Sequence, residues 1–230
     1  MKSLQKTAKI VGALFLIAMA ASLFGGSIVN SIISSSNYFT SSADNKLQLL
    51  TGVLLELING IAVVGIGVLM YPILKKYNER MALGYLCFRV IEAVFCCSIV
   101  ITPLALIKLS QEHLKAGALD AQYLQASGSL LIAVRAGISD LLIPVFFCLG
   151  AGLFYSLLYK SRLLPRLISG WGIIAVILIF AMNMIILFQT AILNAGILMA
   201  LALPMILNEI FLGIWLIVKG FNPDDQIRGD

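Results

Sequence analysis

The chain has 230 residues, of which 60% are hydrophobic and 12% are charged, and its mean hydropathy is +1.01. Soluble domains carry about one quarter charged residues, so a soluble fold of this length could not bury so much apolar surface. The formal net charge of +5 comes from basic residues in short connections between apolar segments, which does not indicate a nucleic-acid partner. We therefore predict an all-α polytopic membrane protein.

Six apolar segments are each long enough to cross a hydrocarbon core of about 30 Å, which takes about 20 helical residues. In chain order they lie near residues 8–33, 47–74, 82–107, 130–159, 167–190 and 195–219. The connections are too short for a soluble domain, so we predict a single domain, one bundle of six transmembrane helices. The first segment has the basic start and small residues of a signal peptide, but its apolar stretch continues to Ile33, beyond the usual length.

Lys and Arg are distributed unequally between the two sides of the predicted bundle. Eleven of the sixteen fall on the side of the termini, and two, Arg89 and Arg135, fall within segments. The other side has Lys46, Lys108 and Lys115. Because cytoplasmic loops carry an excess of Lys and Arg, this asymmetry predicts that both termini are cytoplasmic.

The connection 108–129 is polar and is expected to be a partly helical extracytoplasmic loop. Leu and Ala residues between Leu114 and Leu124 form a weak stripe that is typical of a helix lying on the membrane surface. His113, the single histidine of the chain, is expected to be solvated in this loop.

Ionisable residues within the apolar segments mark the predicted interior. They are Glu56, Arg89, Glu92, Arg135, Asp140 and Glu209. At the centre of a helix in lipid each charge costs about 2.5–3.5 kcal/mol on insertion scales, so we expect these side chains to face inward and find partners. Two acids remain in excess if every residue of the set is ionised.

Spacing predicts some of these partners. Arg89 and Glu92 are three residues apart and can pair within one helix, either as a packing lock or as a gate or proton relay. Glu56 and Asn59 share a helix face for the same reason. Arg135 is expected either to pair with an acid of its own segment or to neutralise Glu56 at a similar depth.

Asp140 is followed four residues later by Pro144. Proline cannot donate the hydrogen bond that the Asp140 carbonyl would accept, so it predicts a break in the helix there. A carboxylate and a freed carbonyl at one point in the membrane suit Na⁺ or a proton. The alternative is a structural ion pair between Asp140 and an arginine.

The last two segments also carry polar groups. Asn183 lies in the fifth segment, and Asn208 and Glu209 lie near the middle of the sixth, shortly after Pro204. Amides in membrane helices usually hold helices together. The second and fourth segments match weakly at a shift of 84 residues that superposes Glu56 on Asp140, which raises the hypothesis of a parallel repeat.

Several short motifs resemble those of a known family. They are KTAKIVG at 6–12, YPILKK at 71–76, LGYLCFR at 83–89, YKSRLLPR at 159–166 and EIFLGIWLIVKG at 209–220. In order and spacing these motifs resemble the bacterial membrane family catalogued as domain of unknown function 4386, over nearly the whole chain. The resemblance implies a multi-pass helical protein of the bacterial inner membrane, and it implies no activity, ligand or catalytic residue.

The acids of the second, fourth and sixth segments favour a carrier or sensor of a small solute, linked to a monovalent cation or a proton. A single loop histidine excludes bis-histidine haem and histidine-rich zinc sites, and no cofactor is expected. One alternative is an intramembrane enzyme that acts on lipid or lipid-linked substrates and uses these acids as general acid–base groups. Another is a structural or partner-regulating membrane protein. Membrane lipid is the expected surrounding, and an oligomer is compatible with the sequence.

Overall fold

The computed structural model describes residues 2–113, 118–188 and 195–222, and within these ranges the chain is helical with no strand. The elements are α1 (Lys2–Ile33), α2 (Tyr38–Asp44), α3 (Lys46–Leu74), α4 (Glu79–Ser98), α5 (Ile101–His113), α6 (Ala118–Gly137), the π-helix η1 (Ile138–Leu142), α7 (Ile143–Ser161), α8 (Arg166–Leu187) and α9 (Ala195–Val218). They form six helical stretches that are long and apolar enough to cross a membrane. The predicted all-α class with six spans is confirmed.

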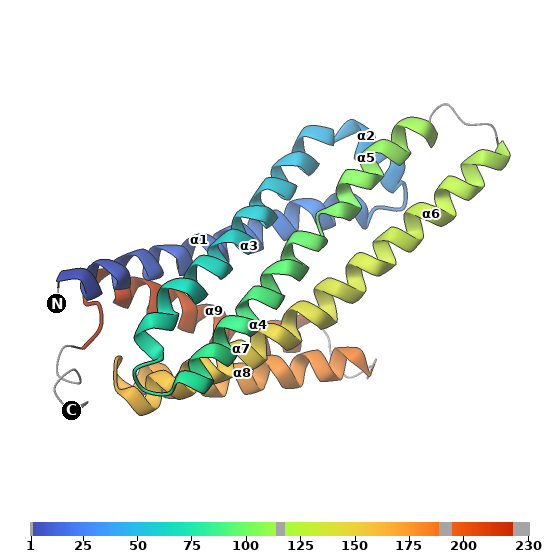
Figure 1. Ribbon diagram of the computed structural model, residues 1–230. Coiled ribbons are helices and arrows are strands. Elements are labelled where there is room, and N and C mark those ends of the chain that lie inside the picture. The colour runs from blue at the N-terminus through green and yellow to red at the C-terminus, as the bar shows by residue number, and fades with distance from the viewer. Residues whose placement is uncertain (1, 114–117, 189–194, 223–230) are drawn as a thin grey trace.

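The six spans form a closed ring in which each span packs against the next along the chain. α1 packs on α3, α3 on α4, α4 on α7, α7 on α8 and α8 on α9, and α9 returns to α1 (Figure 1). The start of α1 and the residues that follow α9 lie close together at one end of the bundle, where the Gln5 side-chain amide donates to the Phe221 carbonyl at 3.0 Å. We call this the terminal end and the opposite one the distal end.

Glycines allow the ring to close between its first and last helices. A Cβ added to Gly12 of α1 would lie 2.6 Å from the carbonyl oxygen of Gly213 on α9. No side chain fits between two backbones at that separation. Close approach through small residues is a principal source of helix association in membranes, where the hydrophobic effect does not drive helices together.

A second close approach joins α7 to α8. A Cβ added to Gly172 would lie 2.2 Å from the ring of Tyr155, which is 1% exposed and has no room to move aside. We therefore expect Gly172→Ala to lower the free energy of unfolding by about 1–3 kcal/mol through overpacking. Thermal unfolding in detergent, followed by circular dichroism, measures this loss.

The matched control for this substitution is Gly152→Ala on α7, because nothing lies within 4 Å of a Cβ added there. Alanine is the better helix former, so this control should leave stability unchanged or slightly raised. Equal stability of the two variants would contradict the contact between α7 and α8.

Apolar side chains cover the outside of the ring and fill its interior toward both ends. Leu54, Ile61 and Val68 follow one another at seven-residue intervals on α3 and are exposed, as expected of a face turned toward lipid. Inside the ring, one buried cluster that includes Tyr85 and Phe154 fills the terminal end, and a second lies at the distal end. Polar groups lie between the two clusters.

Two spans are interrupted before a proline. The third span breaks at 99–100, between α4 and α5, four residues ahead of Pro103. The fourth span contains η1 directly before Pro144, and the Ile143 N–H donates to the Ile138 carbonyl in a π-helical pattern. A proline removes one helical donor and crowds the preceding turn, which accounts for both irregularities.

The segment 108–129, predicted to be partly helical, is helical in its described residues. Residues 108–113 continue α5 and residues 118–129 belong to α6, so both helices extend past the other spans (Figure 1). Leu114, the start of the predicted stripe, lies outside the described residues. His113 ends α5 and stacks on Phe39 of α2 with ring centroids 4.6 Å apart, rather than lying in a solvated loop. The short α2 itself, which packs on α5, was not predicted.

Candidate functional site

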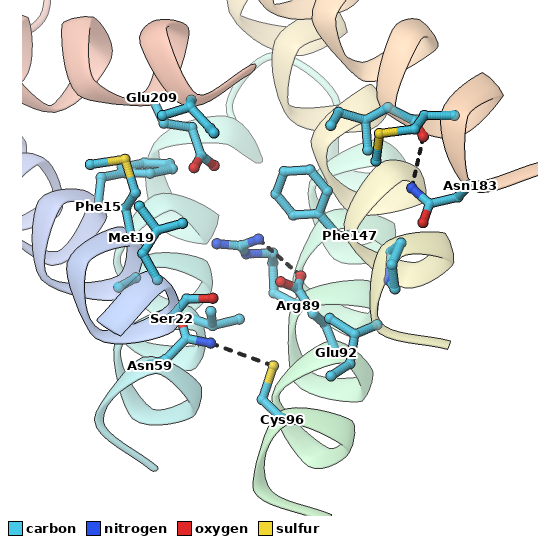
Figure 2. Close-up of a pocket in the computed structure, with 18 residues that line it drawn as sticks. Phe15, Met19, Ser22, Asn59, Arg89, Glu92, Cys96, Phe147, Asn183 and Glu209 are labelled. Atoms are coloured by element: carbon cyan, nitrogen blue, oxygen red, sulfur yellow. Dashed lines mark hydrogen bonds and ion pairs between the residues drawn. The ribbon is translucent and has the colours of Figure 1, made fainter. Parts of the chain in front are cut away.

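A cavity of about 300 Å³ lies inside the ring, between the two apolar clusters. All six spans line it, with Phe15, Met19 and Ser22 of α1, Asn59 and Val63 of α3, Arg89, Glu92 and Cys96 of α4, Pro144 and Phe147 of α7, Ile179, Met182 and Asn183 of α8, and Ile206 and Glu209 of α9 among its walls (Figure 2). A second cavity of about 150 Å³ adjoins it toward the distal end and shares part of the same lining. Helices α8 and α9 do not line this second cavity.

The predicted pair of α4 is confirmed. Arg89 donates from Nη1 to Glu92 Oε2 at 2.9 Å, and each residue is 4% exposed (Figure 2). The stem of Arg89 runs close to Gly67 of α3 and Gly150 of α7, whose missing side chains leave room for it. Arg89 Nε is buried and has no hydrogen-bond partner among the residues that the structure describes. The pair therefore lies in the cavity wall, and Arg89 Nε is available there as a further hydrogen-bond donor.

Glu56 is paired with Arg135, which decides between the two partners predicted for that arginine. The guanidinium contacts both carboxylate oxygens, in a fork geometry, and connects α3 to α6. Its Nη1 also donates to the Ile99 carbonyl at 2.7 Å. That carbonyl is free because Pro103, four residues later, has no N–H to donate. The buried guanidinium of Arg135 thus holds together α3, α6 and the break that follows α4.

Glu209 is an unpaired acid of the cavity. Its carboxylate points from α9 into the open space beside Phe15 and Phe147, on the side of the cavity opposite Asn59 (Figure 2). Among the described residues, no side chain forms a hydrogen bond or an ion pair with it. The site therefore holds one carboxylate that is free to meet a ligand.

The placement of Asp140 contradicts the expectation that this residue faces the interior. Asp140 is exposed, lines neither cavity, and accepts a hydrogen bond only from Ser139 Oγ, at 2.8 Å, within the described residues. Arg135 faces inward, and residues five apart on a helix point about 140° away from each other. Asp140 and Arg135 therefore could not share the inner face. The predicted carboxylate–carbonyl ion site in the interior is wrong.

The profile of the family described as "Domain of unknown function (DUF4386)" matches residues 10–220. The chain belongs to this family. The match reaches into all six spans and includes every residue that lines the two cavities. Nothing among curated proteins or solved structures matches the chain.

The amides of this DUF4386 protein have different placements. Asn208 donates to the Ile168 carbonyl at 3.1 Å and joins α9 to α8, as expected of an amide that holds helices together. Asn59 donates to Cys96 Sγ at 3.6 Å, between α3 and α4, and Asn183 donates to the Ile179 carbonyl of its own helix at 2.7 Å. Asn59 and Asn183 line the larger cavity.

Much of the cavity wall was not predicted from the sequence, because its side chains are apolar. Phe15, Met19 and Phe147 have no property that separates them from other membrane-helix residues. Ser22 and Asn30, polar residues of the first span that line the cavities, are the signals that α1 has an inner polar face. Among the described residues of the DUF4386 protein, no group of three or more His, Cys, Asp and Glu side chains could hold a metal ion.

Proposed function

We propose that the protein binds a small solute in its central cavity, as a carrier or a sensor, and that Glu209 links this binding to a cation or a proton. The observation that carries the proposal is the free Glu209 carboxylate, which faces a cavity lined by six spans. An ionisable side chain inside a membrane domain is by default the mark of a functional site. A volume of about 300 Å³ lies at the lower end of the range for small-molecule sites.

The position of the cavity supports a carrier in particular. It lies between the two apolar clusters, and the terminal cluster, with Tyr85, Phe154 and Tyr155, closes it on one side. On the distal side it continues into the smaller cavity, which the exposed residues Ser22 and Asn30 line. A site closed on one side and continued toward the other is the arrangement from which alternating access begins.

The pairing of the acids favours binding over acid–base catalysis. An enzyme of the type considered for this sequence would use two acids near one substrate atom. Glu92 is held by Arg89 and Glu56 by Arg135, so Glu209 is the one acid of the larger cavity that lacks an arginine partner among the described residues. A purely structural protein would have no need of the cavity.

The proposal includes location and orientation. We place the protein in the bacterial inner membrane, surrounded by lipid, with the terminal end in the cytoplasm. The support is the excess of Lys and Arg that the sequence assigns to the side of the termini, eleven of sixteen in the chain.

The test uses ligand-induced stabilisation of the purified protein. Wild type and Glu209→Gln are unfolded thermally in the presence of a panel of amino acids, sugars, organic acids, amines, NaCl and KCl. A ligand at 100 times its dissociation constant stabilises a protein by about 2.7 kcal/mol. We expect at least one class of solute to raise the melting temperature of the wild type and to have no such effect on Glu209→Gln.

Asp140→Asn is the matched control, since it makes the same change of acid to amide outside the cavity. It should respond to the panel as the wild type does. An identical response of wild type and Glu209→Gln to every solute would contradict the proposal. Uptake of the stabilising solute into proteoliposomes then separates a carrier from a sensor.

A further inference from the structure

The charges that line the cavities do not cancel. In the larger cavity, Arg89 and Glu92 neutralise each other, and Glu209 adds one negative charge when it is ionised. In the smaller cavity, Glu56 and Arg135 are likewise neutral together. When Glu209 is ionised, the combined site therefore has one net negative charge and is complementary to a ligand with one positive charge.

The surroundings of Glu209 suit an organic cation better than a bare metal cation. Na⁺ and K⁺ need a shell of several oxygen ligands. Beside Glu209 the wall has the apolar side chains of Phe15, Phe147 and Ile206 together with Arg89, and Tyr85 and Tyr155 contribute one hydroxyl oxygen each. Figure 2 shows Phe15 and Phe147 on either side of the space that the carboxylate faces. Aromatic rings attract ammonium groups through their negative faces.

The rest of the wall fits a hydrocarbon body. Met19, Ile179, Met182 and Ile206 line the larger cavity, and methionine side chains adapt to irregular apolar shapes. Asn59 stands opposite Glu209 and offers an amide to a polar substituent at the far end of a ligand (Figure 2). A ligand with a charged head, an apolar middle and a polar tail would contact every part of this wall.

We propose that the solute of this cavity is an organic monocation, a protonated or quaternary amine, whose nitrogen lies beside Glu209 between Phe15 and Phe147. The inference rests on the proposed function and specifies the class of its ligand. Glu209 supplies the opposite charge, and the two rings supply cation–π contacts. Arg89 is paired with Glu92 and, among the described residues, forms no ion pair with Glu209.

The experiment measures binding of three compounds of nearly the same shape to the full-length protein in lipid nanodiscs, by isothermal titration calorimetry. They are choline, its uncharged carbon isostere 3,3-dimethylbutan-1-ol, and the anion 3,3-dimethylbutanoate. Choline should bind at least about tenfold more tightly than the alcohol, because the opposite charge and the aromatic contacts favour the cation alone. The anion should bind more weakly than the alcohol.

Two variants test which residues make the difference. Glu209→Gln should abolish the advantage of choline and leave binding of the alcohol unchanged. Phe147→Leu should weaken choline binding roughly threefold or more. Phe146→Leu is its control, since Phe146 packs on Phe88 and Phe95 and does not line the cavity, and it should bind choline as the wild type does.

Equal binding of choline and its carbon isostere, or binding of none of the three, would overturn the inference. The proposed function fails on a different observation. If the solute panel still stabilises the protein in a Glu209-dependent way while choline has no advantage, the cavity binds a solute of another class. If no solute of the panel stabilises the wild type, the proposed function fails as well.

Discussion

Replacement of Arg135 by methionine is expected to lower the free energy of unfolding by about 3–5 kcal/mol, because it leaves the Glu56 carboxylate buried without its counter-charge. The Ile99 carbonyl loses its donor in the same step, and an unsatisfied buried acceptor adds to the loss. Since this arginine joins α3, α6 and the break after α4, the spans should also separate more easily. Thermal or denaturant unfolding in detergent measures the effect.

Two further variants separate charge from geometry. The double replacement of Arg135 and Glu56 by methionine should be closer to wild type than Arg135→Met alone, since no uncompensated charge remains. Arg135→Lys keeps the charge but cannot form the fork, so its stability should lie between those of wild type and Arg135→Met. A double variant that loses the full sum of the two single losses would show that the pair is not a coupled unit.

The second large effect is expected at Arg89. Arg89→Met should lower the free energy of unfolding by about 3 kcal/mol, at the lower end of the range for a broken buried pair, because Glu92 borders a cavity that water can enter. Methionine preserves most of the stem volume beside Gly67 and Gly150. The loss then reports the charge rather than the packing, and unfolding in detergent measures it.

The same substitution should change the binding site in a defined direction. Without Arg89, two carboxylates face the cavity, so binding of choline should be stronger than in the wild type. Adding Glu92→Gln to Arg89→Met should restore both the stability and the choline affinity toward wild-type values. Unchanged stability of Arg89→Met would mean that Glu92 does not need this partner.

Local spacing predicted the interactions that lie within one helix. Arg89 and Glu92 are three residues apart, and that geometry is the same in any α-helix. The Glu56–Arg135 pair joins residues 79 apart, and the sequence indicated it only as one of two partners at a similar depth. Depth in the membrane can be estimated from the sequence, whereas the rotation of each helix about its axis is decided by packing.

Asp140 shows what that rotation changes. Its charge and its distance from Pro144 suggested an inner site, but Arg135 occupies the inner face of the same helix. The five-residue separation between the two was a signal against both facing inward. Pro103 was a usable signal as well, since a proline four residues after Ile99 frees a carbonyl for a distant donor. The wall of the cavity depends on side chains from six spans, and these form no pattern within any one segment of the sequence.

The contact between the first and last helices has a consequence for biogenesis. As the chain leaves the ribosome, α1 enters the bilayer long before α9. The face of α1 that carries Gly12 therefore lacks the helix that packs on it through most of synthesis. The ring, and with it the cavity, is completed only by the span that carries Glu209. Because Gln5 and Phe221 are hydrogen-bonded neighbours, a circularly permuted gene that joins these ends would deliver the same helices to the membrane in a different order.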